Sequence, residues 1–208
     1  MSRRSHTSSD PLQAVANRHG LADGDQPRKL ILMRGLPSCG KTTRAKELAG
    51  DAGVALEFDE YFYTQVGTDP SRYDWSRKRL SDAREWNVER ATLALALGLS
   101  PVVLDDDNGL GQTTRRVVRA ALEHGYVIEF QEPRTPWWRE IRELLRDKRA
   151  NKQALEIWAS KLTGLSRATH RVPFESFLRR IERWQDELTV DAVIAAALPS
   201  QAKPLTAG

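Results

Sequence analysis

The stretch LILMRGLPSCGKTT, residues 30–43, decides the fold of this chain. Its first four residues are apolar, as in a strand that is buried on both faces, and they lead into a G-x-x-x-x-G-K-[ST] loop. Good helix formers follow from Arg44 to Ala49, and Gly50 then provides a stop. A strand, this loop and a helix, in that order, are the setting in which the motif binds a nucleoside triphosphate.

The spacing inside the loop predicts how it binds phosphate. Gly35 and Gly40 allow the backbone to curl so that successive N–H groups point at the β-phosphate. Lys41 is expected to reach the β- and γ-phosphate oxygens and to act in catalysis. Thr42 is expected to offer its hydroxyl to Mg²⁺ where the helix begins. The predicted nucleotide-binding residues are Gly35, Leu36, Pro37, Ser38, Cys39, Gly40, Lys41, Thr42 and Thr43.

Length and composition indicate one soluble domain. The chain has 208 residues, of which 40% are hydrophobic, and it contains no long apolar run. The single cysteine, Cys39, excludes an intrachain disulfide framework and agrees with a reducing compartment. Within the loop it is either an oxidisable thiol or a small filler. No apolar segment follows Arg3 and Arg4, so we expect a cytoplasmic protein without a membrane partner.

The pattern along the chain predicts one ordered domain, residues 29–198, between two tails. Residues 1–28 are predicted to be a flexible tail with one helical turn near residues 13–16, and residues 199–208 a second tail. The domain alternates strand and helix patterns, which predicts an α/β fold of the P-loop NTPase class with a parallel sheet flanked by helices. Strands are expected at residues 29–33, 54–58, 101–104 and 126–131.

Two further helices are expected between these strands. The first covers residues 74–97 and ends at Gly98. The second covers residues 115–124, with Thr113 or Thr114 as its N-cap, and closes at Gly125.

Chemistry in a parallel α/β sheet gathers at the carboxyl ends of the strands. The second strand runs into Asp59, which would accept the proton of an attacking hydroxyl beside the triphosphate, or else serve only as a helix cap or loop anion. The third strand runs into Asp105, Asp106 and Asp107. Asp105 is the predicted Mg²⁺ partner, and the alternative is an exposed acidic turn.

Short strings along the chain follow a family pattern: Arg34-Gly35-Leu36-Pro37, Asp59-Glu60-Tyr61-Phe62, Ala83-x-Glu85-Trp86-Asn87-x-x-Arg90-Ala91, Ser100-Pro101, Asp105-x-x-Asn108, Gly125-Tyr126 and Glu132-Pro133-x-Thr135-Pro136-Trp137. In this order and spacing they resemble the polynucleotide-kinase-like P-loop domains. That family includes phage-type polynucleotide 5′-kinases and the ATP-binding kinase domain of the Nedd-four-binding proteins. The resemblance extends from about residue 29 to residue 184.

The resemblance implies an ATP- and Mg²⁺-dependent kinase that phosphorylates the 5′-hydroxyl of a nucleic acid. Asp59 matches the family's catalytic carboxylate, and Asp105 and Asn108 match the ends of its Asp-Asn-Thr-Asn string. Residues 165–173, LSRATHRVP, resemble the family's lid. Arg167 would then be the catalytic lid arginine that clamps the transferring phosphoryl group.

The region of the lid, about residues 137–173, is longer than in the family and predicts one or two extra helices. Its basic residues would track a nucleic-acid backbone beside stacking tryptophans, or else the tryptophans are core and the basic residues are its solvated side. None of the four histidines has ligand spacing, so no zinc site is expected. The residues concerned are Arg142, Arg146, Lys148, Arg149 and Lys152, Trp137, Trp138 and Trp158, and His6, His19, His124 and His170.

Two other functions remain open from the sequence. One is a small-molecule kinase of the zeta-toxin or antibiotic-phosphotransferase type, which has the same loop, carboxylate and lid arginine but a closed pocket for its acceptor. The other is a binding module whose partner affinity is switched by ATP.

Overall fold

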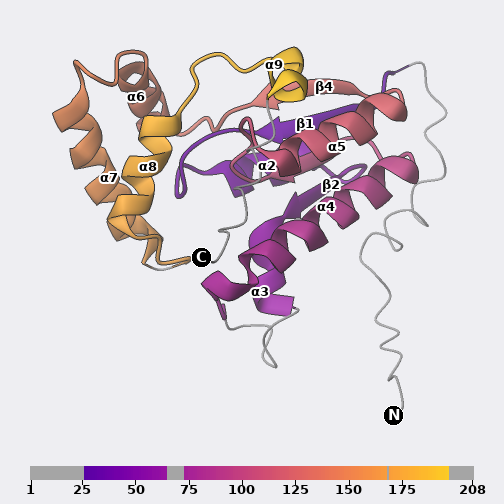
Figure 1. Ribbon diagram of the computed structural model, residues 1–208, viewed down its shortest axis with the longest axis horizontal. Helices are drawn as coiled ribbons and strands as arrows, with labels where there is room; N and C mark the ends of the chain where they lie inside the picture. Colours follow the sequence, from indigo (N-terminus) through magenta and orange to yellow (C-terminus); the bar gives the residue numbers. More distant parts are fainter. Residues whose placement is uncertain (1–25, 65–72, 168, 197–208) are drawn as a thin grey trace, which may run out of the picture.

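The structure, a computed structural model, describes residues 26–64, 73–167 and 169–196 (Figure 1). The predicted tail 199–208 lies outside the described residues. So does nearly all of the predicted tail 1–28, including the expected helical turn near residues 13–16.

A parallel sheet of four strands forms the centre of the molecule. The strands are β1 (Lys29–Met33), β2 (Val54–Glu57), β3 (Val102–Asp105) and β4 (Val127–Gln131), and they lie in the order β2-β3-β1-β4. β1 pairs with both β3 and β4, which aligns Leu32 with Leu104 and with Phe130. The predicted α/β fold is therefore confirmed. β1 has its predicted bounds, whereas each of the other three strands differs from its prediction by one residue at one or both ends.

Helices cover both faces of the sheet, which is why β1 is apolar throughout. Ile31 and Met33 pack against α2 (Lys41–Ala49) on one face. Leu30 and Leu32 face the opposite side, as alternate residues of a strand must. There they join the core formed with α4 (Leu80–Ala96), α5 (Gln112–Glu123) and α9 (Val190–Ala195).

Two predicted helix starts were wrong. The helix expected from residue 74 begins with the 3₁₀ turn η2 (Arg77–Arg79) and continues as α4 from Leu80. The helix expected from residue 115 begins at Gln112, and its N-cap is Gly111, with no side-chain cap. Thr113 and Thr114 therefore lie inside its first turn. Both helix starts were misplaced because capping depends on local backbone angles that composition does not reveal.

A separate group of helices stands to one side of the sheet (Figure 1). It comprises α6 (Pro136–Leu145), α7 (Lys152–Ser166) and α8 (Phe174–Arg183), and we call it the helical lobe. The lobe has its own core, whose largest buried side chains are Trp138 and Phe177. Its first two helices occupy the segment where extra helices were predicted. Among the described residues, no helix has the length and apolarity needed to cross a bilayer.

Candidate functional site

The phosphate-binding loop connects β1 to α2 at the carboxyl edge of the sheet. Its two signature glycines adopt positive φ, 146° at Gly35 and 88° at Gly40, and Ser38 also has a positive φ of 60°. A Cβ atom at Gly40 would lie 2.9 Å from the Cγ2 of Thr135. Glycine is therefore required at this position both by backbone conformation and by space.

Residues at the start of the helical lobe stabilise the phosphate-binding loop. The Thr135 hydroxyl donates a 3.0 Å hydrogen bond to the carbonyl of Cys39, and the Trp137 indole donates one of 3.3 Å to the carbonyl of Ser38. The side chains of Leu36 and Cys39 are buried in the core of the lobe. The conformation of the loop is thus fixed by residues almost a hundred positions away in sequence.

Cys39 is a filler in this structure. Its side chain is fully buried, and burial raises the pKa of its thiol to about 12, against the smaller opposing effect of Lys41. A thiol that stays protonated and enclosed reacts slowly with oxidants. The structure therefore favours the filler over the oxidisable thiol.

Lys41 lies over the loop, where a triphosphate would bind. Its ammonium donates hydrogen bonds to the carbonyls of Gly35, at 3.0 Å, and Leu36, at 3.2 Å. It also lies 3.7 Å from a carboxylate oxygen of Asp107. Two carbonyls and one carboxylate thus hold the ammonium at the loop.

The three aspartates at the carboxyl end of β3, of which Asp105 is its last residue, differ from one another. Asp105 is buried, with 5% of its surface exposed, and its Oδ2 has no hydrogen-bond partner among the described residues. A buried, unpartnered carboxylate oxygen is well suited to a metal ion. The second proposed metal ligand, Thr42, lies in the first turn of α2, which packs against β3.

Asp106 and Asp107 have opposite electrostatic environments. Burial and the charge of Asp107 raise the pKa of Asp106 to about 7. Burial alone would also raise the pKa of Asp107, but Lys41 and an ion pair with Arg180 of α8 outweigh it and lower that pKa. Asp107 is exposed, and it contacts both Lys41 of the phosphate loop and Arg180 of the helical lobe.

Asn108 has a structural position. Its side-chain amide is buried and donates hydrogen bonds of 2.8 Å to the carbonyls of Met33 and Leu104. These bonds tie the loop after β3 to the end of β1. This geometry accounts for an asparagine here without any contact to a metal.

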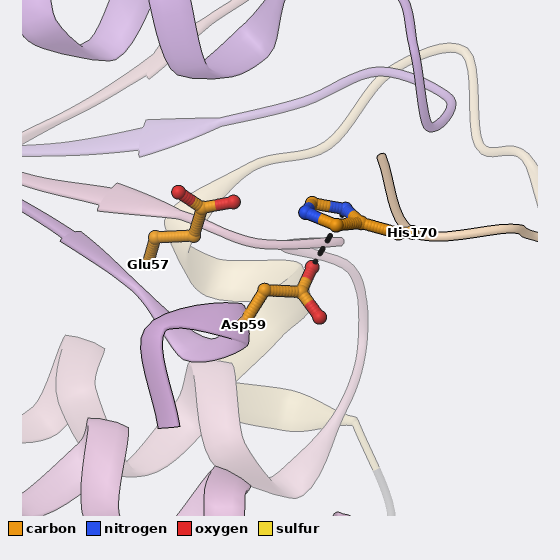
Figure 2. A group of neighbouring side chains, drawn as sticks. All are labelled: Glu57, Asp59 and His170. Atoms are coloured by element: carbon orange, nitrogen blue, oxygen red, sulfur yellow. Dashed lines mark ion pairs between the residues drawn. The ribbon is translucent and has the colours of Figure 1, made fainter. Parts of the chain in front are cut away.

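Asp59 lies in the 3₁₀ turn η1 (Phe58–Glu60), directly after β2. Its Oδ1 accepts a 2.7 Å hydrogen bond from the hydroxyl of Tyr73. Its Oδ2 lies 3.3 Å from the Nδ1 of His170, which belongs to the loop between α7 and α8 (Figure 2). We call Asp59, Tyr73 and His170 the acceptor cluster.

The charges of the phosphate loop and of the residues after β3 act on this cluster. Burial, with a smaller effect from the charge of Asp107, raises the pKa of Asp59 against the opposing effects of His170, Tyr73 and Lys41. Burial, followed by the charges of Asp105 and Asp59, also raises the pKa of Glu57 to about 8. Both carboxyls are therefore easier to protonate than ordinary surface acids.

The rings of the acceptor cluster pack against one another and against Tyr63. The ring of Tyr73 lies 4.9 Å from that of His170 and 5.1 Å from that of Tyr63, at interplanar angles of 33° and 45°. Sequence reasoning missed Tyr73 entirely, and it placed His170 in the lid string without expecting it to bind a metal, because no other ligand lies near it in the sequence. No local pattern marks these contacts, because they form only when the lobe packs against the edge of the sheet.

The predicted lid arginine, Arg167, lies at the end of α7 with its side chain exposed. The buried residue Ser166 makes hydrogen bonds to residues on both sides of the lid loop. The Ser166 hydroxyl donates to the carbonyl of Thr163, at 2.8 Å, and accepts from the backbone N–H of Val172, at 3.0 Å. The structure thus brings His170 of the lid, rather than Arg167, into contact with Asp59.

Two basic residues of the predicted nucleic-acid surface are half-buried and have partners within the protein. Arg142 pairs with Glu132, at 3.2 Å, and with Asp186. The ammonium of Lys148 donates to two backbone carbonyls at the end of α8, both at 2.8 Å. Both basic residues therefore already have partners within the protein, and contact of either one with a nucleic-acid backbone stays a prediction.

The other predicted surface residues vary in their surroundings. Arg146 pairs with Glu143 on its own helix, and Lys152 lies 3.9 Å from Glu156. Arg149 is exposed.

The three tryptophans also differ. Trp138 is a core residue, whereas Trp137 supports the phosphate loop. Trp158 has the ammonium of Lys161 over its ring at 4.4 Å. An interpretation as core is therefore right for Trp138, and stacking on Trp137 would require its indole to leave the loop.

The fold and the loop together define a P-loop NTPase, with a parallel sheet, a glycine-rich phosphate loop after β1 and an acidic β3 end. The family model described as "AAA domain" matches residues 30–171, and the chain belongs to this family. The chain is also 30% identical over 174 residues to human NEDD4-binding protein 2. That alignment covers 83% of this chain, which spans only 8% of the length of the human protein.

Proposed function

We propose that this protein is an ATP-dependent phosphotransferase that acts on the 5′-hydroxyl of a nucleic acid. The observation that supports this most is the position of Asp59. Its half-buried carboxylate lies at the carboxyl edge of the sheet, within electrostatic reach of Lys41 in the phosphate loop. A carboxylate beside the bound triphosphate is what transfer to a hydroxyl requires.

The loop and Lys41 form the donor side of the proposed site. Backbone N–H groups of residues 35–42, except Pro37, which has none, bind the triphosphate, and the Lys41 ammonium exchanges its loop carbonyls for phosphate oxygens. Thr42 and Asp105 would hold Mg²⁺, which neutralises charge on the phosphates when bound. Positioning and charge neutralisation supply most of the acceleration, because phosphoryl transfer has a loose transition state.

Asp59 forms the acceptor side. It accepts a hydrogen bond from the substrate hydroxyl and orients that oxygen toward the γ-phosphorus. As the new P–O bond forms, the bond from the γ-phosphorus to the β,γ-bridging oxygen breaks, and the hydroxyl proton passes to Asp59. Its raised pKa brings this base closer to neutrality. Arg167, exposed at the lid, is the proposed clamp for the charge on the transferring group.

Two features of the acceptor side favour a nucleic acid. The rings of Tyr63, Tyr73 and His170 lie next to the accepting carboxylate, and aromatic rings bind nucleobases of any sequence by stacking. Arg167 and Arg171 flank His170 in the chain, and both are exposed. They are suited to contact phosphates that follow the 5′-terminal nucleotide.

A transfer assay with γ-labelled ATP tests this function. The acceptors are 5′-hydroxyl RNA and DNA oligonucleotides, free nucleosides, sugar nucleotides and an aminoglycoside, with Lys41→Ala as the inactive control. We expect label on an oligonucleotide and little on the small molecules. Label on a small molecule alone would favour a zeta-toxin-type or antibiotic kinase. Hydrolysis without transfer to any acceptor would favour an ATP-switched binding module.

A further inference from the structure

We propose that Glu57, Asp59 and His170 form a binding site for a transition-metal ion of the Zn²⁺ class, distinct from the Mg²⁺ that accompanies ATP. One ligating atom from each residue, a carboxylate oxygen or an imidazole nitrogen, lies within 4.8 Å of the other two. Figure 2 shows the His170 ring directed to the space between the two carboxylates. The site joins the end of β2 to the lid.

The donor set selects the metal. Mg²⁺ and Ca²⁺ prefer oxygen ligands alone, whereas one imidazole nitrogen with two carboxylate oxygens suits Zn²⁺ and its neighbours. Three protein ligands also leave one position for water, as in open zinc sites. Bonds of about 2.0–2.2 Å at tetrahedral angles place two ligand atoms on one ion about 3.4 Å apart. Closing the observed spread therefore needs a shift of up to about 1.4 Å, which rotation of the half-buried Glu57, Asp59 and His170 side chains can supply.

Neighbouring residues already orient two of the ligands. The Tyr73 hydroxyl binds Oδ1 of Asp59 at 2.7 Å and leaves Oδ2 facing His170. The Tyr73 ring packs against the imidazole at 4.9 Å. Such outer contacts fix ligand orientation in metal sites and are worth about 10–100-fold in affinity.

The backbone of the lid is also held in place. The N–H of Arg171 donates to the carbonyl of Ser166 at 2.8 Å, in addition to the bonds that the Ser166 side chain makes. His170 therefore sits in a closed loop of a few residues. A metal ion bound to it would tie the helical lobe to the edge of the sheet.

One consequence rests on the function proposed above. An ion on Oδ2 of Asp59 occupies the atom that the acceptor hydroxyl needs. Zn²⁺ should therefore inhibit transfer competitively against the oligonucleotide and not against ATP. Loss of this inhibition in His170→Ala would agree with the site, whereas competition against ATP would place the inhibitory ion at the phosphate loop instead.

Direct binding tests the site without any assay of transfer. The chain contains four histidines, so replacing His6, His19 and His124 with alanine leaves His170 alone. Zn²⁺ is titrated calorimetrically into this full-length, nucleotide-free variant, and we expect one ion per chain. Adding His170→Ala should weaken binding by about 100-fold or more, because even outer partners are worth about 10–100-fold.

Further variants separate this site from the proposed Mg²⁺ site. Glu57→Gln should weaken Zn²⁺ binding strongly, and Tyr73→Phe, which keeps the ring, should weaken it about tenfold. Asp105→Asn removes a charge that raises the pKa of Glu57, so it should leave Zn²⁺ binding intact and make the Glu57 carboxyl easier to deprotonate. Circular dichroism confirms that each variant is folded, and His170→Gln serves as a second variant if His170→Ala is unstable.

Three results would overturn the site. The first is the absence of a bound ion in the variant whose sole histidine is His170. The second is an affinity that His170→Ala and His170→Gln leave unchanged. The third is a loss of binding in Asp105→Asn with none in Glu57→Gln. None of these results depends on whether the protein transfers phosphate.

Discussion

The phosphate loop and the acceptor cluster both begin where a strand of the sheet ends, after β1 and after β2, but they are assembled in different ways. The loop is a run of consecutive residues, 35–43, and its curl follows from glycines with positive φ. The acceptor cluster brings Asp59, Tyr73 and His170 together from three separate segments. A motif defines the first, whereas only the packing of the helical lobe against the sheet defines the second.

This difference predicts that substitutions in the two regions have separable effects. Changes in the loop should act on nucleotide binding, and changes in the acceptor cluster should act on the acceptor step. The lobe connects the regions, because Thr135 and Trp137 support the loop and His170 of the lid contacts Asp59. A variant that disturbs both regions equally would show that they are one unit.

The largest effect is expected from Lys41→Ala. Among the described residues the ammonium has polar contacts with two loop carbonyls and Asp107, so its loss should cost the fold about 1 kcal/mol. Turnover of ATP should fall about a thousandfold or more, because the charge beside the phosphates is removed. Steady-state kinetics measure this, with exposed Lys46→Ala on the same helix as the control. A folded Lys41→Ala protein with normal turnover would contradict the assignment of the loop.

Cys39 tests whether the loop is held in the core. Because burial raises the pKa of its thiol to about 12, the thiolate fraction stays low throughout the range from pH 7 to 9 and rises only near pH 12. At pH 8 the native protein should react with iodoacetamide about a thousandfold more slowly than the urea-unfolded chain. Mass spectrometry follows the modification. Equal rates in both states would mean that the loop opens freely.

Gly40→Ala tests the local geometry of the loop. The new Cβ meets Thr135 at 2.9 Å in a left-handed conformation, so we expect a loss of about 1–3 kcal/mol in the free energy of unfolding and weaker ATP binding. Gly164→Ala is the matched control. It lies in α7 with open space around it, so it should stabilise the protein by about 0.5–1 kcal/mol. Urea unfolding curves that rank the two variants in the opposite order would contradict this account.

The smallest effect concerns the acceptor side. Arg167→Ala combined with Arg171→Ala should weaken binding of a 5′-hydroxyl oligonucleotide and flatten its log–log salt dependence by roughly 0.7 for each phosphate that the protein no longer neutralises. Fluorescence anisotropy without ATP measures this. Exposed Arg119→Ala on α5 is the control and should leave the slope unchanged. A slope that changes equally in both proteins would mean that general charge, and not the lid, attracts the nucleic acid.

Much of the fold could be predicted because its signals are local. The stretch at residues 30–43 specifies a buried strand, a loop and a helix within one window, and β1 has its predicted bounds. The alternation of strands and helices then implies a parallel sheet. Helix starts failed where capping decided them, as at Gly111, because no side-chain signal marks that residue.

The candidate site was predictable only in part. Asp59 and Asp105 could be placed at the sheet edge because each follows a strand that the pattern reveals. The contact of His170 with Asp59 could not, since it depends on how α7 and the lid pack. For a related reason, the sequence left open whether Arg142 contacts a nucleic acid and whether Trp138 is a core residue. The composition of an amphipathic helix does not tell which of its polar residues pair inside the molecule.

The central claim is that Asp59 serves the acceptor while the loop serves the nucleotide. Asp59→Asn keeps the shape of the side chain and removes its charge. We expect transfer to a 5′-hydroxyl oligonucleotide to fall by about two to four orders of magnitude, with the ATP dissociation constant changed by less than about threefold.

The pH dependence of the same reaction provides a second readout. A base must be ionised to act, and the raised pKa of Asp59 moves its ionisation above that of an ordinary aspartate. The kcat/KM of the wild type should therefore rise with pH as Asp59 ionises, at a higher pH than for an ordinary aspartate. The kcat/KM of Asp59→Asn should not show this rise.

The most direct test measures transfer and ATP affinity on the same preparations of wild type, Asp59→Asn and the exposed control Asp51→Asn. Loss of transfer with ATP affinity retained, in Asp59→Asn alone, is the predicted result. Loss of ATP affinity with substantial residual transfer would place Asp59 among the ligands of the nucleotide-bound metal and contradict the account.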